Sequence, residues 1–134
     1  MGGKFVISLD FELHWGNVES TDVNVTKFLA TRESIVEVLA LFEKYKIRAT
    51  WATVGYLFSN DLESLKSYFP AAIPQYKNKV ISTYSLFTDS KIGANEDADP
   101  LHFGYSLLEK IKAVPGQEIA SHTFSHYYTN EDGQ

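Results

Sequence analysis

Short apolar segments alternate with helical patterns in the first half of the chain. Residues 4–10 form a short, β-rich apolar run of the kind expected for a strand buried on both faces. Apolar residues then recur at helical spacing over 35–42, which predicts a helix of roughly four turns. Residues 48–54 are again short and rich in β-branched side chains, and Gly55 follows them. This order of strand, helix and strand predicts a parallel crossover unit.

The middle of the chain predicts one helix and a long irregular segment. Asn60 or Asp61 is placed to cap a short helix that ends before Pro70, and we expect it to be a second crossover helix. Residues 70–98 contain two prolines and many polar residues without sustained periodicity. Because compact domains rarely contain so long an irregular segment, we expect a functional loop or an insertion with local strands around residues 80–84.

A third helix and a third strand are predicted near the end of the chain. Asp99-Pro100 has the pattern of an N-cap followed by proline at the first helical position, and the apolar stripe behind it ends before Pro115. Residues 117–121 then form a short strand-like segment that ends at His122. The whole chain, residues 1–134, is therefore predicted to be a single α/β domain with parallel strands and crossover helices.

Composition limits the kinds of partner that the protein can bind and predicts its cellular compartment. The net charge is -5, and Lys and Arg are scattered singly, so we expect no basic face for nucleic acid. The apolar segment at the N-terminus is too short for a signal peptide or a membrane span, which predicts a cytoplasmic protein without membrane contact. Cysteine is absent. Disulfides, thiolate metal sites and cysteine nucleophiles are therefore excluded.

Acidic and histidine side chains follow the first and third predicted strands. Asp10 and Glu12 are two residues apart, so strand alternation places both carboxylates on the same side. His122 and His126 bring their imidazoles to one face if the chain turns helically there. Taken singly, each of these residues is more often a cap or a surface residue. Their joint position at the carboxyl ends of parallel strands predicts a catalytic divalent metal site with an open position for water.

These motifs resemble the polysaccharide deacetylases that contain the NodB homology domain. Residues 8–12 (SLDFE) are similar to the first motif of the family, 49–55 (ATWATVG) to its second strand and 122–126 (HTFSH) to its histidine motif, H-[ST]-x-x-H. The resemblance implies a partial, distorted (β/α) barrel that hydrolyses the acetamide of N-acetylated sugars with zinc or a related divalent ion. By this resemblance the general base is Asp10, and the metal ligands are Glu12, His122 and His126.

The resemblance covers only the first part of the family domain. The family usually has adjacent aspartates, whereas Phe11 stands between Asp10 and Glu12 here. The Arg and Pro loop and the general-acid histidine of the family do not occur after His126. We therefore expect the chain alone to lack deacetylase turnover. If it is limited to these residues, we also expect a homo-oligomer that covers the open edge of the sheet.

Three aromatic or histidine residues are candidates for binding a carbohydrate substrate: His14, Trp15 and Tyr84. Trp15 fits core packing equally well. We expect His102 at the surface and the acidic residues of 95–99 in a solvated loop. The leading hypothesis is a metal-dependent polysaccharide deacetylase. The alternatives are a hydrolase of another non-peptide C–N bond on the same fold and a non-catalytic barrel fragment that binds sugar.

Overall fold

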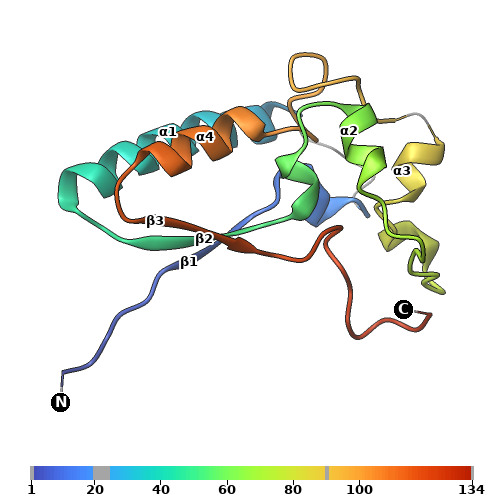
Figure 1. Ribbon diagram of the computed structural model, residues 1–134, viewed down its shortest axis with the longest axis horizontal. Coiled ribbons are helices and arrows are strands. Elements are labelled where there is room, and N and C mark those ends of the chain that lie inside the picture. The colour runs from blue at the N-terminus through green and yellow to red at the C-terminus, as the bar shows by residue number, and fades with distance from the viewer. Residues whose placement is uncertain (1, 20–24, 90, 134) are drawn as a thin grey trace.

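The sheet of the computed structural model has three parallel strands in the order β1-β2-β3 (Figure 1). Leu9 in β1 pairs with Trp51 in β2, which pairs with Ile119 in β3. Because all strands run in the same direction, their carboxyl ends lie at one edge of the sheet. The strands are β1 (Ser8–Phe11), β2 (Ala49–Thr53) and β3 (Gln117–Ser121), and the structure describes residues 2–19, 25–89 and 91–133.

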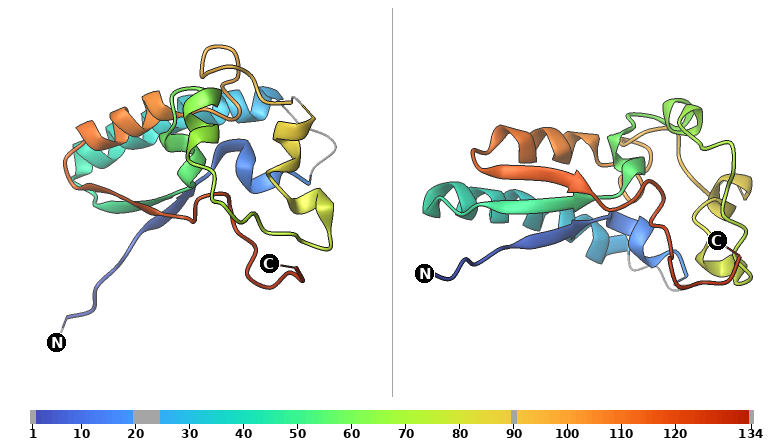
Figure 2. Two further views of the ribbon diagram at one scale, coloured as in Figure 1. Left: turned by 45° about the vertical axis from the view of Figure 1, so that its right-hand side comes forward. Right: turned by 60° about the horizontal axis from the view of Figure 1, so that its bottom comes forward.

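Two long helices, α1 and α4, cover the same face of the sheet (Figures 1 and 2). Helix α1 (Val25–Tyr45) connects β1 to β2, and α4 (Tyr105–Ala113) precedes β3. Both strand connections are therefore crossovers, as the sequence predicts. The shorter helices are η1 (Leu13–Asn17), η2 (Gly55–Phe58), α2 (Leu62–Ser67), η3 (Lys79–Ile81) and α3 (Ser85–Thr88). No helix of the described residues is long and apolar enough to cross a membrane.

The core lies between the sheet and these two helices. Trp51 occupies its centre and meets the ring of Phe11 edge-on at a centroid distance of 6.2 Å. The opposite face of the sheet holds small or polar residues, and on β1 both Ser8 and Asp10 are exposed. The prediction of a strand buried on both faces is therefore wrong. Only one face is covered within the described residues, and Asp10 lies on the other.

The described residues form an open sheet of three strands, and they do not close the barrel that the resemblance implies.

Helix α1 is longer than predicted, with 21 residues. Its buried stripe passes through Arg32, whose guanidinium donates hydrogen bonds to the carbonyls of Pro100 and Phe103. A charged residue at a contact position interrupts the apolar pattern, so the periodicity shows only part of the helix.

The prediction for the middle of the chain is partly confirmed. Asp61 caps α2, because its Oδ1 accepts a hydrogen bond from the backbone N–H of Ser64 at 2.7 Å. The prediction of local strands around residues 80–84 is wrong, since the helices η3 and α3 lie in that region.

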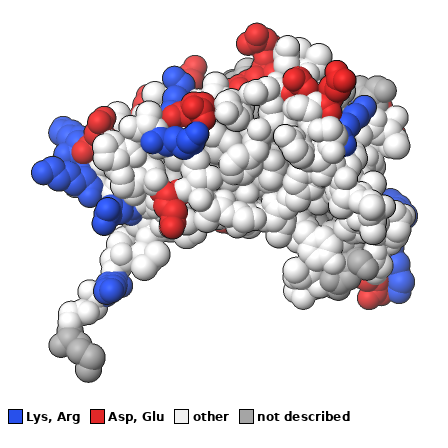
Figure 3. All heavy atoms as spheres, in the orientation of Figure 1, with Lys and Arg blue, Asp and Glu red and all other residues white. Residues whose placement is uncertain are grey.

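On the face shown in Figure 3, charged residues lie mainly along the margins, and the central surface is largely uncharged.

The predicted start of the third helix is also wrong. Helix α4 begins at Tyr105, after Gly104 as its N-cap. Asp99 instead caps a separate turn over residues 100–102, because its Oδ1 accepts a hydrogen bond from the backbone N–H of His102 at 3.3 Å. The same carboxylate accepts from the backbone N–H of Gly93 and from the ring of His102.

Candidate metal centre

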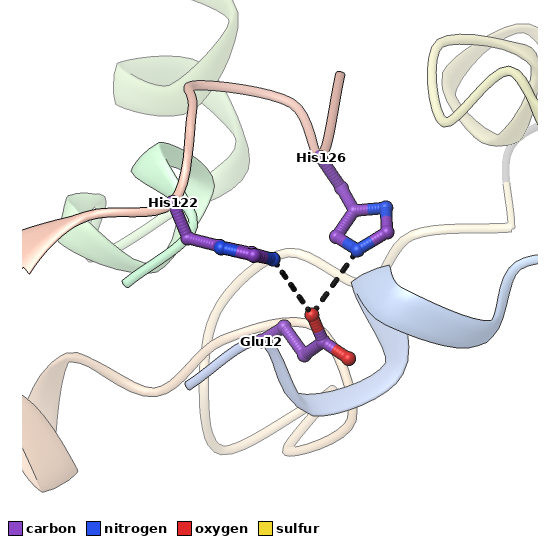
Figure 4. A group of neighbouring side chains, drawn as sticks. All are labelled: Glu12, His122 and His126. Atoms are coloured by element: carbon purple, nitrogen blue, oxygen red, sulfur yellow. Dashed lines mark ion pairs between the residues drawn. The ribbon is translucent and has the colours of Figure 1, made fainter. Parts of the chain in front are cut away.

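Glu12, His122 and His126 converge at the carboxyl edge of the sheet (Figure 4). Oε2 of Glu12 lies 3.1 Å from Nε2 of His126 and 3.4 Å from Nε2 of His122. One candidate ligand atom from each residue lies within 4.8 Å of the other two. The side chains are 28%, 32% and 20% exposed for Glu12, His122 and His126, so the group is shielded yet open on one side. The metal-binding triad expected from the sequence is thus assembled.

The loop that carries the two histidines is not helical. Thr123 and His126 both have left-handed backbone conformations, with φ of 62° and 54°. The helical turn that the sequence argument gave as the condition for convergence is therefore not present, and the imidazoles converge by another route. Non-glycine residues in this region cost about 1–3 kcal/mol each, so the surrounding structure has to hold them in place.

The end of β2 and the start of η2 hold this loop. The backbone N–H of Gly55 donates to the carbonyl of Thr123 at 2.9 Å, and the N–H of Tyr56 donates to that of Phe124 at 3.1 Å. A Cβ atom at Gly55 would lie 2.7 Å from Cα of Phe124, so a larger residue there would push the loop away. The close approach of two backbones therefore explains the glycine in this position.

A second glycine gives space to the carboxylate ligand. Glu12 immediately precedes η1, and its side chain folds back over Gly16 in that helix. A Cβ atom at Gly16 would lie only 1.8 Å from Oε1 of Glu12. The carboxylate thus occupies the space that a side chain at position 16 would fill, and the backbone of η1 sets its position.

Asp10 lies beside the triad rather than within it. Its Oδ1 atom is 3.8 Å from Nδ1 of His122, which is the ring nitrogen that faces away from Glu12. Its side chain is 63% exposed. At 3.8 Å this contact is longer than a hydrogen bond, so Asp10 does not fix the orientation of the His122 ring. The exposure also leaves one oxygen of Asp10 accessible to a substrate.

The donor set fits a divalent ion of the zinc type, which binds imidazole nitrogen and carboxylate oxygen. Both imidazoles direct Nε2 at the same oxygen of Glu12. Nδ1 of His126 is buried and has no hydrogen-bond partner among the described residues, so the polar contacts of this ring are concentrated at Nε2. Three ligands would leave a coordination position on the exposed side for water or substrate.

The carboxylate and His126 stabilise each other's charged forms in the metal-free protein. The hydrogen bond from His126 holds the pKa of Glu12 below its ordinary value and outweighs partial burial, and the charges of both histidines add to this effect. The same hydrogen bond raises the pKa of His126, against the opposing effect of burial. Each of these two side chains therefore favours the charged form of the other.

Two of the candidate substrate-binding residues lie in the interior. The Trp15 side chain is fully buried and stacks on the ring of Phe87 at a centroid distance of 5.7 Å, so it belongs to the core. His14 is also buried, and its Nδ1 lies 3.0 Å from Nε2 of His102. Neither residue faces an open surface. The third candidate, Tyr84, is half-buried beside the histidine loop.

A buried polar group that the sequence did not predict lies against η1. His102, expected at the surface, is only 6% exposed, and Asp99 beside it is also buried. Glu96 pairs with Arg32 and is not a member of a solvated acidic loop. The spacing of Asp99 and His102, three residues apart, was the available signal, since side chains at that spacing meet in a turn.

A groove of about 360 Å³ lies beside the histidine loop. Thr123 and Ser125, which stand between the two histidines in the chain, form part of its wall. No charged residue lines it in the part of the chain that the structure describes. Its other lining residues are Tyr68, Pro70, Ala72, Pro74, Tyr84, Phe124 and Tyr127.

No protein-family model, curated protein or solved structure matches this chain. What the residues do must therefore be inferred from their geometry and chemistry. The geometry defines an open, three-stranded parallel α/β fold with a Glu/His/His group that can hold a metal ion at its carboxyl edge.

Replacing Gly16 by alanine should weaken metal binding while the fold is kept. The new Cβ would displace the flexible end of Glu12, which costs little stability but moves the carboxylate away from the histidines. We expect the zinc dissociation constant to rise about 10- to 100-fold, as for other changes that reorient a ligand. Gly3→Ala is the matched control, since nothing lies within 4 Å of that position. Equal zinc affinity in the two variants would show that the space above Gly16 does not set the position of the Glu12 carboxylate.

The Glu12–His126 ion pair should give the metal-free protein a defined pH window of extra stability. The lowered pKa of Glu12 makes its contribution complete above its ordinary value of 4.5, and the contribution is lost as pH falls through the folded pKa. The raised pKa of His126 makes its contribution complete below 6.5, and the contribution is lost as pH rises through the folded pKa. The difference in melting temperature between wild type and His126→Gln should therefore be largest between these two values.

With zinc bound, the loss of stability that His126 causes above pH 6.5 should become a gain. Protons compete with the metal for His126, so the zinc-induced rise in melting temperature should grow as pH increases above 6.5. Thermal melts with and without zinc at several pH values test both trends. The same pH trend with and without zinc would show that the imidazole is not a ligand.

Proposed function

We propose that the chain is a metal-dependent hydrolase of the polysaccharide-deacetylase type, which removes acetyl groups from N-acetylated sugars. The observation that carries this proposal is the convergence of Glu12, His122 and His126 at the carboxyl edge of a parallel sheet. The resemblance of the SLDFE and HTFSH motifs to this family adds the substrate class.

The three triad residues would hold a zinc ion, with the remaining position directed to the open side. Such an ion, when bound, polarises a carbonyl oxygen and makes water a stronger acid. Asp10 would act as general base, because its exposed carboxylate lies on the same side as the triad and next to His122. In the overall reaction water adds to the acetamide carbonyl, the C–N bond breaks, and acetate and the free amine leave. The proton donor to the amine is not assigned to a residue.

The lining of the groove beside the histidine loop favours a carbohydrate as the substrate. Tyr68 is 67% exposed at its rim, and Tyr84 lies further inside. Aromatic rings and proline faces pack well against the apolar faces of sugar rings, and tyrosine hydroxyl groups can form hydrogen bonds with sugar hydroxyls. Because the lining has no charged group, an uncharged glycan suits it better than an acidic one.

Substitutions of the two carboxylates should separate metal binding from catalysis. Glu12→Ala should lose most zinc affinity, whereas Asp10→Asn should keep it and lower kcat about 100-fold, the usual contribution of a general base. An aryl acetate is the suitable substrate for this test, because its phenolate leaves without a proton donor. His122→Ala serves as the metal-free reference. Hydrolysis by zinc-loaded wild type no faster than by this reference would overturn the proposed function.

The groove can be tested independently of the chemical step. Tyr68→Ala should weaken binding of a neutral chitooligosaccharide about fivefold, through loss of one stacking contact, without changing hydrolysis of the small aryl acetate. Tyr45→Ala is the control, since Tyr45 is similarly exposed but lies at the end of α1. Equal sugar affinity in both variants, measured by calorimetry, would exclude this groove as the glycan site.

A further inference from the structure

The turn that presents Glu12 has one local backbone hydrogen bond, from the N–H of Trp15 to the carbonyl of Glu12 at 3.0 Å, but no side-chain cap. It is a single short 3₁₀ helix, η1. Leu13, its first residue, has a left-handed backbone with φ of 48°. A non-glycine residue in this conformation costs about 1–3 kcal/mol and persists only when other contacts impose it. The position of Glu12 therefore depends on contacts from outside the turn.

Those contacts come from the segment before α4. The backbone N–H of His14 donates to the carbonyl of Leu101 at 3.2 Å, and Nε1 of Trp15 donates to that of His102 at 2.8 Å. The side chains of His14 and His102 also meet, with Nδ1 and Nε2 3.0 Å apart. Three hydrogen bonds thus attach η1 to the residues around His102.

His102 is oriented in turn by Asp99. Its Nδ1 lies 2.8 Å from Oδ2 of Asp99, and the backbone N–H of Gly93 donates to the same oxygen at 2.8 Å. Burial opposes ionisation of Asp99, but these hydrogen bonds outweigh it and keep the pKa of the carboxyl below its ordinary value. Asp99, His102 and His14 are each more than nine-tenths buried, so water cannot replace their partners.

We infer that the chain of hydrogen bonds from Asp99 through His102 to His14 positions the Glu12 carboxylate for metal binding. The mechanical connection is Gly16, whose backbone lies against that carboxylate. If η1 shifts, the surface that confines Glu12 shifts with it, and the distance to His122 and His126 changes. The inference rests on the proposed function, and it adds Asp99 and His102 to the residues on which the metal site depends.

Asp99→Asn tests this role with almost no change in size. A carboxylate accepts from both Gly93 and His102, whereas an amide has one accepting oxygen and one donating nitrogen, so one of the two donors then faces another N–H group. We expect the zinc dissociation constant to rise about tenfold, a typical effect of losing an outer partner of a metal site. Competition with a fluorescent zinc chelator measures it.

The matched control is Glu96→Gln. Glu96 lies in the same segment and pairs with Arg32 and Ser106, but it makes no contact with η1 among the described residues. It should lower the melting temperature and leave the zinc dissociation constant within about twofold of wild type. Equal weakening of zinc binding by Glu96→Gln and Asp99→Asn would assign the effect to general stability and overturn the inference.

A double-mutant cycle distinguishes positioning of Glu12 from a general effect on stability. If the hydrogen bonds from Asp99 to His14 act through Glu12, Asp99→Asn should have no further effect on the residual zinc affinity of Glu12→Ala. Additive losses would overturn the inference. If Asp99→Asn shows no cooperative melting transition, Trp15→Phe carries the same test, because it removes the donor to the His102 carbonyl and keeps an aromatic ring in the core, and it should weaken zinc about three- to tenfold.

The outcomes separate this inference from the function on which it rests. Failure of wild type to bind zinc would overturn the proposed function and the positioning role together. Zinc binding by wild type with an unchanged dissociation constant in folded Asp99→Asn would overturn the positioning role alone. Weakened binding in Asp99→Asn, with Glu96→Gln unaffected and no further loss in the Glu12→Ala background, is the result we expect.

Discussion

Parallel pairing of β1 and β3 with the central strand β2 is the constraint on which the other features depend. It brings the residues that follow β1 and β3 to one edge of the sheet, although Glu12 and His122 are 110 residues apart in the chain. The crossover helices α1 and α4 make this pairing possible and supply the apolar face that covers Trp51. The opposite face holds small and polar residues and carries Asp10 toward the same edge.

The candidate metal centre is built from irregular backbone supported by regular elements. Leu13 and His126 both adopt left-handed conformations close to the ligands, and each needs an external support. The start of η2 supports the histidine loop through backbone hydrogen bonds at Gly55 and Tyr56. The buried polar residues before α4 support the turn of Glu12. Each half of the site thus depends on a different neighbouring segment, which allows mutations to perturb one half without the other.

The long segment before α4 has a structural role that its composition hides. Asn95 and Asp97 are exposed, but Glu96 binds Arg32 of α1 and the buried Asp99 binds His102. These contacts hold the segment against both α1 and η1. The Asp99 carboxylate accepts from both Gly93 and His102, which specifies one arrangement of the segment more strictly than apolar packing would. The segment therefore serves as the support of the Glu12 turn.

The sequence by itself determined the local features. Apolar runs and helical spacing located the three strands and parts of the helices α1, α2 and α4, and Asp61 was one of the two residues expected to cap α2. The positions of Asp10, Glu12, His122 and His126 at strand ends were also readable, because strand order and direction follow from the crossover pattern. Only the tertiary structure decided the non-helical histidine loop, the burial of His14, Trp15 and His102, and the use of Asp99 as a buried acceptor. These features depend on contacts between residues that are distant in sequence, such as Gly55 with Phe124 and His14 with His102, and local periodicity carries no information about such contacts.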